Sequence, residues 1–470
     1  MKMDVSHEMQ GVNLLDSRLN RRAARLVRTI ARHPAAGFPS VFDSESGLEA
    51  FYRFVNNDAV SPDRLLAPHA GEAWRRAASD PGPVLVLHDT SEFTFKGETP
   101  RQGLVQKDAS QGFYGHFALA VALNEAPLVH GVVGHRSYVV EDGLWVETQG
   151  KKGDEVELLV GSERWSDLVK EVRASPPPNQ QLIHVMDREA DDYVLWTNIV
   201  DQGDDFVIRA RHDRRVAEAH MKSFEQVGAE PFVVSREVNL SRRGKRRPPR
   251  TVKTHPARDS RSARLSIRAV QLDVTRPARA APLGAPTMSL ALVEVVEIDP
   301  PDNATPVRWL LWSTLPIDTP DRISKIVDIY RKRWLIEEYF KALKTGCAAE
   351  KRQARSLSTL LNTITLLIPI AWRLLVLRAV TRHQPDAPAE LVMDEIEVRA
   401  LRHMAKAVKL QGRLTCRDVM LAVARIGGHL RSNGEPGWLI LGRGLERLLD
   451  FAVGWRAAVQ FTATLEGQEM

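Results

Sequence analysis

Two short apolar runs, each ending in an aspartate, constrain the fold of this chain most. VLVLHD ends at Asp89, and QLIHVMD ends at Asp187. Aliphatic runs of this length predict buried strands. Between them lie two further β-runs around a turn at 124–127 and a charged helical stretch at 155–172, and FVIRAR (206–211) follows as another strand. This alternation predicts an α/β core with carboxylates at two strand ends.

The stretch YRKRWLIEEYFKALKTG, residues 330–346, predicts a helix. Asp318 or Thr319 can cap it, Pro320 suits the first helical position, and Gly346 suits a left-handed C-cap. At 3.6 residues per turn, four side chains share one stripe of this helix: Tyr330, Arg333, Glu337 and Lys344. Such a stripe suits a catalytic face, and the alternative is a solvated face with ion pairs such as Arg333–Glu337.

Three carboxylates meet if Asp89 and Asp187 end neighbouring strands and Glu337 lies on a helix packed against them. Oxygen-only ligation selects Mg²⁺ or Mn²⁺. Two such ions, roughly 3.5–4 Å apart, can activate a water or a 3′-hydroxyl in phosphodiester displacement. Glu338 competes with Glu337 but lies about 100° away from the stripe, so we choose Glu337. Strand alternation points His88 to the face opposite Asp89, where we expect it to be packed.

Composition limits the class of protein. The chain has 470 residues, 43% of them hydrophobic, which suits two or three domains. Its two cysteines, Cys347 and Cys416, exclude a disulfide framework and a cysteine-based zinc site, and they fit a reducing cytoplasm. The N-terminus lacks the apolar core of a signal peptide. The most apolar segment, 357–377, is interrupted by polar residues and a proline, so we expect a buried helix rather than a membrane span.

Clusters of basic residues matter more than the net charge of +6. Residues 11–76 have helical periodicity, and one helix face carries Arg18, Arg21, Arg22, Arg25, Arg28 and Arg32. No acid follows Asp16 within this face, so we expect a phosphate-contacting helix that uses Arg21, Arg22 and Arg25. An ordinary exposed face is the alternative. The run RRGKRRPPR at 242–250 is either a backbone-binding arm or a solvated loop.

The segments HDTSEFTF and DREADDY, together with the spacing Tyr330–Arg333–Glu337–Lys344, resemble a group of bacterial cut-and-paste DDE transposases. This is the Y-R-E-K insertion-sequence group (the IS-four type), which includes the transposase of a kanamycin-resistance composite transposon. The resemblance implies an RNase H-like, mixed-sheet core with a β-rich insert and helical terminal regions. We therefore expect a DNA-end-binding domain at 1–78, a catalytic domain at 79–355 with its insert at about 212–316, and a dimerisation domain at 356–470.

The resemblance also implies roles for single residues. Two Mg²⁺ ions per active site, replaceable by Mn²⁺, would be held by Asp89, Asp187 and Glu337. Contacts with DNA phosphates would come from Tyr330, Arg333, Lys344, Lys341, Arg209 and Arg211. Trp309 would stack on a flipped base during hairpin formation, although Trp312, three residues on, is a second tryptophan in the same run.

These expectations describe a transposase that binds terminal inverted repeats, nicks them, forms and resolves hairpins, and transfers the strands. Its partners would be double-stranded DNA of the ends and target, and a second copy of the chain in a synaptic complex. It would work in the bacterial cytoplasm, without a membrane. Two alternatives stay open: a catalytically weak DNA-binding regulator and a structure-selective nuclease. The presence of all three acids argues against the regulator. The long insert and the helical tail argue against the nuclease, which would not need them.

Overall fold

The computed structural model forms two compact units. The first comprises residues 1–180 and 334–470, and the second comprises residues 181–333. The predicted boundaries at 78/79 and 355/356 differ from these limits, and the three-domain division stays a prediction. The structure describes residues 5–466 except for 6, 43, 81, 98, 108–109, 125–128, 142–143, 149–157, 160–162, 176–179, 241–258, 282, 303, 406–411, 431 and 433.

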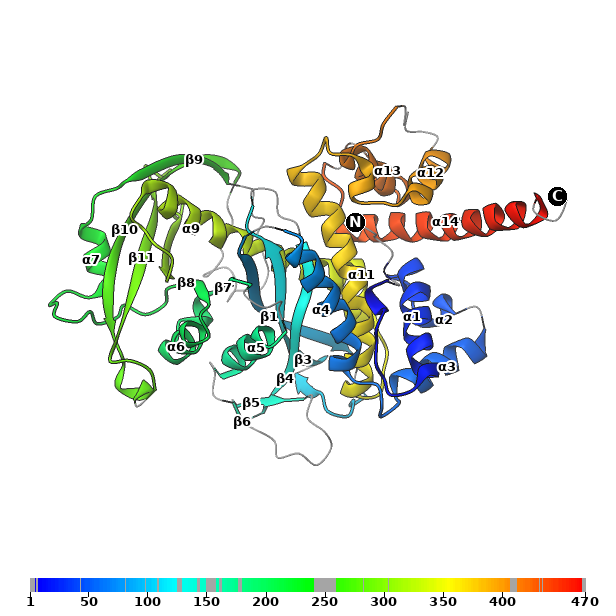
Figure 1. The fold of residues 1–470 in the computed structure, drawn as a ribbon, viewed down its shortest axis with the longest axis horizontal. Helices are drawn as coiled ribbons and strands as arrows, with labels where there is room; N and C mark the ends of the chain where they lie inside the picture. The colour runs from blue at the N-terminus through cyan, green and yellow to red at the C-terminus, as the bar shows by residue number, and fades with distance from the viewer. Residues whose placement is uncertain are drawn as a thin grey trace. The chain divides into compact units, whose positions relative to one another are not determined.

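An antiparallel sheet forms the centre of the first unit, in the order β6-β5-β4-β3-β1 with β2 paired to β3 (Figure 1). Its strands are β1 (Val84–Lys96), β2 (Val105–Lys107), β3 (Ser110–Ala122), β4 (Val129–Glu141), β5 (Leu144–Glu147) and β6 (Leu158–Leu159). Most positions of β1, β3 and β4 are buried, including neighbouring residues that point to opposite faces. Both faces of this part of the sheet are therefore covered.

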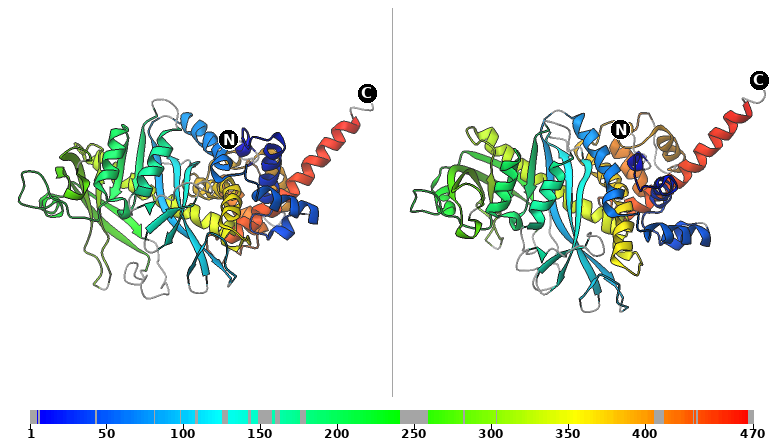
Figure 2. Two further views of the ribbon diagram at one scale, coloured as in Figure 1. Left: turned by 90° about the horizontal axis from the view of Figure 1, so that it is seen from below. Right: turned by 60° about the horizontal axis from the view of Figure 1, so that its bottom comes forward.

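Helices from both ends of the chain surround this sheet. The N-terminal ones are η1 (His7–Met9), α1 (Ser17–Arg32), α2 (Phe38–Val41), α3 (Glu45–Val55) and α4 (Pro62–Ala78), followed by α5 (Glu163–Arg173). The later ones are α10 (Trp334–Lys341), η4 (Ala342–Gly346), η5 (Ala349–Lys351), α11 (Leu357–His383), η6 (Ala389–Leu391), α12 (Glu395–Met404), α13 (Cys416–Ile426) and α14 (Trp438–Glu466). Figure 2 shows the C-terminal part of α14 extending beyond the helices around it.

Helix α11 is the buried helix that the sequence predicts. It is long and apolar enough to cross a membrane, yet its apolar window is completely buried inside the unit. Its polar side chains have partners there: Asn362 Nδ2 donates to the carbonyl oxygens of Val55 and Val60 at 2.9 and 3.0 Å. Arg373 forms an ion pair of 2.7 Å with Glu397 of α12. These bonds offset the cost of burying polar groups in an apolar helix.

The second unit is built on a mixed sheet in the order β7-β8-β12-β11-β10-β9. The strands are β7 (Leu182–Met186), β8 (Asp205–Arg209), β9 (Val234–Leu240), β10 (Arg261–Thr275), β11 (Thr287–Ile298) and β12 (Arg308–Ser313). Strands β7 and β8 pair in parallel, the neighbours along this order from β8 to β9 pair antiparallel, and β9 to β12 form the predicted β-rich insert. The helices are η2 (Arg188–Ala190), α6 (Tyr193–Asp201), α7 (Ser223–Ala229), η3 (Ala278–Ala280) and α9 (Pro320–Lys332). The basic run at 242–250 lies outside the described residues.

The prediction of one regular helix through 330–346 is wrong. Thr319 and Pro320 begin α9 as expected, with the Thr319 side chain accepting from the backbone N–H of Arg322 at 3.3 Å. However, α9 ends at Lys332, α10 begins at Trp334, and residues 342–346 form a π-helical turn. The left-handed residue after this turn is Ala348, with φ at 49°, rather than Gly346.

Tertiary packing gives Gly346 a different role. A Cβ added there would lie 2.8 Å from Leu374 Cδ1 of α11, and one added at Gly442 of α14 would lie 2.8 Å from the Gly346 carbonyl oxygen. The backbones of η4 and α14 therefore approach too closely for a side chain, which is a constraint that no local sequence pattern reveals.

Candidate active site

Asp89 lies on the face of β1 that is covered by α10. It pairs across the strands with Phe117 of β3, and directly paired residues project from the same face of a sheet. The Phe117 ring contacts the rings of Tyr339 and Phe340 in α10, with centroids 5.9 and 5.5 Å apart. Glu337 precedes Phe340 by three residues, so the two are neighbours on the helix surface. Asp89 and Glu337, both partly buried, therefore lie on the same side of the sheet.

His88 is packed on the opposite face, as predicted. Its ring is completely buried and stacks on His116 of β3, with centroids 6.0 Å apart. His116 in turn contacts Trp165 of α5 at 4.4 Å. The face of β1 that carries His88 is therefore part of the core under α5.

Glu338 is buried among cations. Its Oε1 atom lies 2.7 Å from Lys341 Nζ, and its Oε2 atom lies 3.7 Å from Arg378 Nε and 3.6 Å from Arg382 Nη1. Its side chain is 8% exposed, whereas Glu337 is only partly buried. This packing favours Glu337 over Glu338 as the catalytic acid, which stays a prediction.

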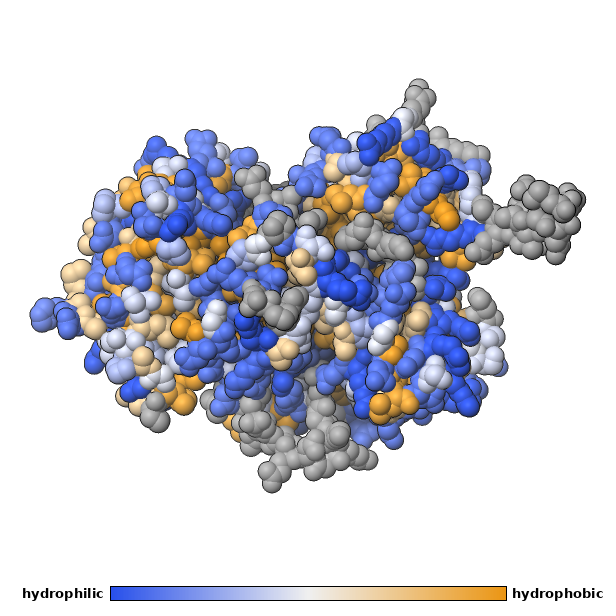
Figure 3. Space-filling model, in the orientation of Figure 1, coloured by the Kyte–Doolittle hydropathy of each residue, from blue (hydrophilic) through white to orange (hydrophobic). Residues whose placement is uncertain are grey.

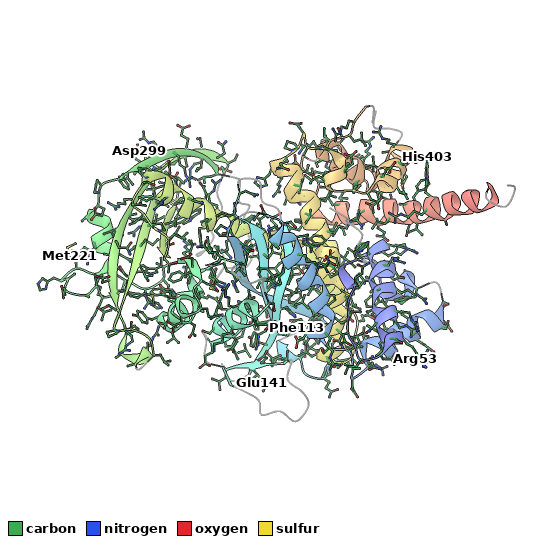
Figure 4. The ribbon with its side chains drawn as sticks, viewed as in Figure 1. Arg53, Phe113, Glu141, Met221, Asp299 and His403 are labelled. Atoms are coloured by element: carbon green, nitrogen blue, oxygen red, sulfur yellow. The ribbon has the colours of Figure 1, made fainter. Side chains whose placement is uncertain are left out.

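Lys344 lies in the π-helical turn and reaches the same face of β1. Its Nζ atom donates to the Glu92 carbonyl oxygen, lies 3.4 Å from a Glu350 carboxylate oxygen and stands 4.8 Å over the Phe93 ring. Phe93 has the same strand parity as Asp89, so both point to one face. Its ring stacks on that of Phe113, labelled in Figure 4, at 5.0 Å. Lys344 is thus fixed beside β1 by protein contacts.

Asp187 follows the completely buried strand β7 and caps the next short helix, η2. Its Oδ1 atom accepts from the backbone N–H of Glu189 at 2.8 Å. Its carboxylate also acts on Tyr330 at the end of α9. Burial raises the pKa of Tyr330, the positive charges of Arg333 and Arg209 oppose that rise, and the negative charge of Asp187 adds to it. These four side chains therefore form one electrostatic cluster within the second unit.

Trp309 lies beside Tyr330, as the sequence argument requires. The two ring centroids are 5.6 Å apart with the planes at 67°, and Trp309 is partly exposed on β12. Trp312 is completely buried, and its ring centroid lies 5.6 Å from that of Trp196 in α6. Strand alternation has separated the two tryptophans, so that Trp312 is the core residue and Trp309 is the accessible one.

The remaining predicted DNA contacts are distributed over both units. Arg209 is partly buried at the end of β8, and Arg211 is exposed just beyond it. The backbone N–H of Arg211 donates to Asp191 Oδ2 at 2.5 Å, and the buried Asp191 also pairs with Arg214. This fixes the backbone while leaving the Arg211 side chain at the surface. Lys341 pairs with Glu338 as described above.

Helix α1 has the amphipathic form that the arginine pattern predicts. Its buried face consists of Ala23, Leu26, Val27, Ile30 and Ala31. Arg21, Arg22 and Arg25 are exposed, and no acid in the described part of the chain pairs with them. On the face drawn in Figure 3, the surface over α1 and α3 is mainly hydrophilic. This exposed basic face is available to an anionic ligand.

The predicted residues thus form two groups. Asp89, Glu337 and Lys344 lie on one sheet face of the first unit, and Asp187, Tyr330, Arg333, Arg209 and Trp309 lie in the second. The division between the units falls between Arg333 and Trp334. Within the residues that the structure describes, no three His, Cys, Asp or Glu side chains are close enough together to hold a metal ion.

Two protein-family models match the chain. Residues 3–60 match a transposase DNA-binding family, and residues 161–372 match a transposase DDE domain family. The chain carries the domains of a DDE transposase. The first match contains α1 and its arginines, and the second contains Asp187, Trp309 and the segment from Tyr330 to Lys344, whereas Asp89 precedes it. The DDE domain confirms the RNase H-like fold, and the protein is a transposase that binds DNA and catalyses its cleavage and transfer. DDE domains generally use divalent metal ions.

Sequence reasoning missed three arginines of this transposase. Arg378 and Arg382 of α11 reach Glu338, which is 40 or more residues earlier in the chain. Arg352, which is 3% exposed, donates to the carbonyl oxygens of Pro34, Ala36 and Cys347 and so joins the loop after α1 to the end of η4. No local periodicity marks the contacts with Glu338, Pro34 and Ala36, because these partners come from distant segments.

Proposed function

We propose that this transposase belongs to the Y-R-E-K insertion-sequence group and excises DNA by cut and paste through hairpin-ended intermediates. The proposal rests chiefly on the strand register and ring contacts that support placing Asp89 and Glu337 on the same side of the sheet. Lys344 on the same face and the cluster around Tyr330 in the second unit support it. Together these residues are the acids and phosphate-binding groups that the signature requires.

Asp89, Asp187 and Glu337 are the proposed ligands of two Mg²⁺ ions, with Mn²⁺ as a substitute. The donor set fits, because three carboxylates offer only oxygen atoms, which these ions prefer. Asp89 and Glu337 are partly exposed, so neither is closed off inside the core. The metal chemistry that these carboxylates would hold in place is the activation of a water or a 3′-hydroxyl and the stabilisation of the leaving oxygen.

The remaining residues hold the DNA. Tyr330 and Arg333 are hydrogen-bonded to each other, and burial keeps the Tyr330 phenol protonated by raising its pKa. With Lys344 they bind backbone phosphates and so position the bond that is cut. Trp309 presents a partly exposed indole beside Tyr330 and receives the base that leaves the stack when a hairpin forms. Arg209, Arg211, Lys341 and the α1 arginines supply further phosphate contacts.

Two copies of the chain pair two DNA ends in a synaptic complex in the bacterial cytoplasm. The helical region 356–470, which contains α11 to α14, is the proposed dimerisation domain. The DNA substrates are the terminal inverted repeats and a target duplex.

A cleavage and strand-transfer assay tests this function. The substrate is a duplex that carries the DNA flanking the coding region, incubated with the full-length protein and Mg²⁺, and a gel resolves nicked, hairpin, double-strand-break and transfer products. The transposase should give all four in that order. End binding without any cleavage would indicate the regulator, and cleavage without hairpins or strand transfer would indicate the nuclease.

A further inference from the structure

A cluster of cations on α10 and α11 carries more positive charge than its buried carboxylate neutralises. Lys341, Arg378 and Arg382 all face the single carboxylate of Glu338, at 2.7, 3.7 and 3.6 Å. The nearby Glu435 acts on Arg378, but Arg417 pairs with it at 2.7 Å. Among the described residues that form these ion pairs, one carboxylate against three cations leaves a surplus of two positive charges.

The two guanidinium groups have unused hydrogen-bonding capacity. Both stand beyond hydrogen-bonding distance from Glu338 Oε2, and Arg378 Nη1 is a buried atom with no hydrogen-bond partner among the described residues. Burial and the positive charge of Arg382 lower the pKa of Arg378. A bound anion would relieve this repulsion and accept the hydrogen bonds that Glu338 leaves unmade.

The cluster is packed against α14 at Arg378 and reaches solvent at Lys341 and Arg382. Arg378 is 14% exposed and its guanidinium lies 4.6 Å from the Trp438 ring centroid of α14, which fixes its position. Lys341 and Arg382 are 40% and 43% exposed, so their charges reach the surface. Two guanidiniums and an ammonium held on two helices match the charge and the several acceptor oxygens of a phosphate group.

We propose that Arg378 and Arg382, together with Lys341, form a binding site for a DNA backbone phosphate next to the catalytic segment. The site adjoins Glu338, so it lies on the same helix as the candidate acid Glu337. That the ligand is DNA depends on the proposed function. The excess of positive charge does not, because it follows from the ion pairs within the first unit.

Salt dependence of DNA binding tests the site. Fluorescence anisotropy with a labelled duplex of arbitrary sequence, without divalent metal, gives the slope of log affinity against log salt for the full-length protein. Each lost phosphate contact lowers the slope by roughly 0.9. The ratio of the wild-type affinity for DNA to that of Arg382→Gln should therefore fall about eightfold when the salt concentration rises tenfold. Arg399→Gln, which removes an exposed cation paired one to one with Glu395, is the matched control.

Glu338→Gln separates a phosphate site from a set of counter-ions. It removes the carboxylate that faces all three cations of the cluster while keeping its shape, so a phosphate site should bind DNA more tightly and with a steeper salt slope. If the three cations only neutralise Glu338, Glu338→Gln should lower the melting temperature without raising the affinity for DNA, and that result overturns the proposal. A wild-type salt slope for Arg382→Gln also overturns it. Failure of the proposed function is distinct, because it appears as wild-type protein that binds DNA and never cuts it.

Discussion

At the scale of single residues, Glu337 and Glu338 show how two adjacent carboxylates acquire different roles. Glu338 points into the contact between α10 and α11 and neutralises part of a cation cluster, whereas Glu337 stays partly exposed on the side of Asp89. The helix rotation of about 100° between neighbouring residues accounts for the difference. That rotation is a local property of a helix, so the preference for Glu337 can be predicted from the sequence.

Alanine substitutions of the acids should separate catalysis from stability. Asp89→Ala, Asp187→Ala and Glu337→Ala should each abolish nicking and leave DNA-end binding nearly unchanged, since they remove metal ligands rather than DNA contacts. Glu338→Ala should keep measurable nicking and lose about 3–5 kcal/mol of stability, because it leaves buried cations without their partner. Gel assays of nicking and thermal melting check both. Normal cutting by Glu337→Ala would show that Glu337 is not the catalytic acid.

Alanine substitutions of the two tryptophans in β12 should impair different steps of the reaction. Trp312→Ala should cost about 3–5 kcal/mol and impair every step, because it leaves a cavity beside Trp196. Trp309→Ala should leave melting, end binding and first-strand nicking near normal and slow hairpin formation, because the extruded base loses stacking of roughly 1–3 kcal/mol. A time course that resolves nicked, hairpin and broken products distinguishes the two. A uniform loss for Trp309→Ala across all three products contradicts the stacking role.

At the scale of elements, α1 combines a buried apolar face with an exposed row of arginines. Replacing Arg21, Arg22 and Arg25 together by Ala should weaken binding to DNA ends and lower the salt slope by roughly 2.7, which is about 0.9 for each phosphate contact. Melting should change little, since the apolar face is untouched. Arg75→Ala on α4, an exposed arginine paired with Glu72, serves as the control. An unchanged slope would assign the α1 arginines to an ordinary solvated surface.

Elements whose form depends on local pattern were predictable, and those shaped by distant contacts were not. The strands that end at Asp89 and Asp187 follow from apolar runs, and the start of α9 follows from Thr319 and Pro320. The π-helical turn does not, because the approach of Gly442 to the Gly346 backbone comes from a helix nearly a hundred residues later. The cation cluster around Glu338 was missed for the same reason.

At the scale of the whole molecule, buried histidines link the stability of the first unit to pH. Burial lowers the pKa of His135 to about 3, and burial with the neighbouring Arg76 lowers that of His130 to about 4. Both are neutral in the folded state and have an ordinary pKa near 6.5 when unfolded. The unfolded chain therefore binds more protons below about pH 6.5, and folding loses stability as the pH falls from there toward the folded values.

Calorimetric melting between pH 7 and pH 4.5 measures this loss. Each histidine should remove about 1.4 kcal/mol of stability per pH unit below 6.5, so the transition of the first unit should move steeply to lower temperature. His135→Gln should flatten the profile relative to wild type even if it lowers the melting temperature at neutral pH. A variant profile parallel to that of the wild type would show that His135 does not titrate on unfolding.

The π-helical turn also affects how this transposase is compared with its relatives. Such a turn accommodates one more residue than the regular helix, and it therefore corresponds to a single-residue insertion. In a relative with a regular helix over this stretch, we expect the cation equivalent to Lys344 one position nearer to its glutamate. A search with a fixed spacing of seven residues would overlook such a protein, and an alignment without a gap at 342–346 would assign the wrong lysine or arginine. Position over the strand, rather than distance along the chain, identifies the equivalent residue.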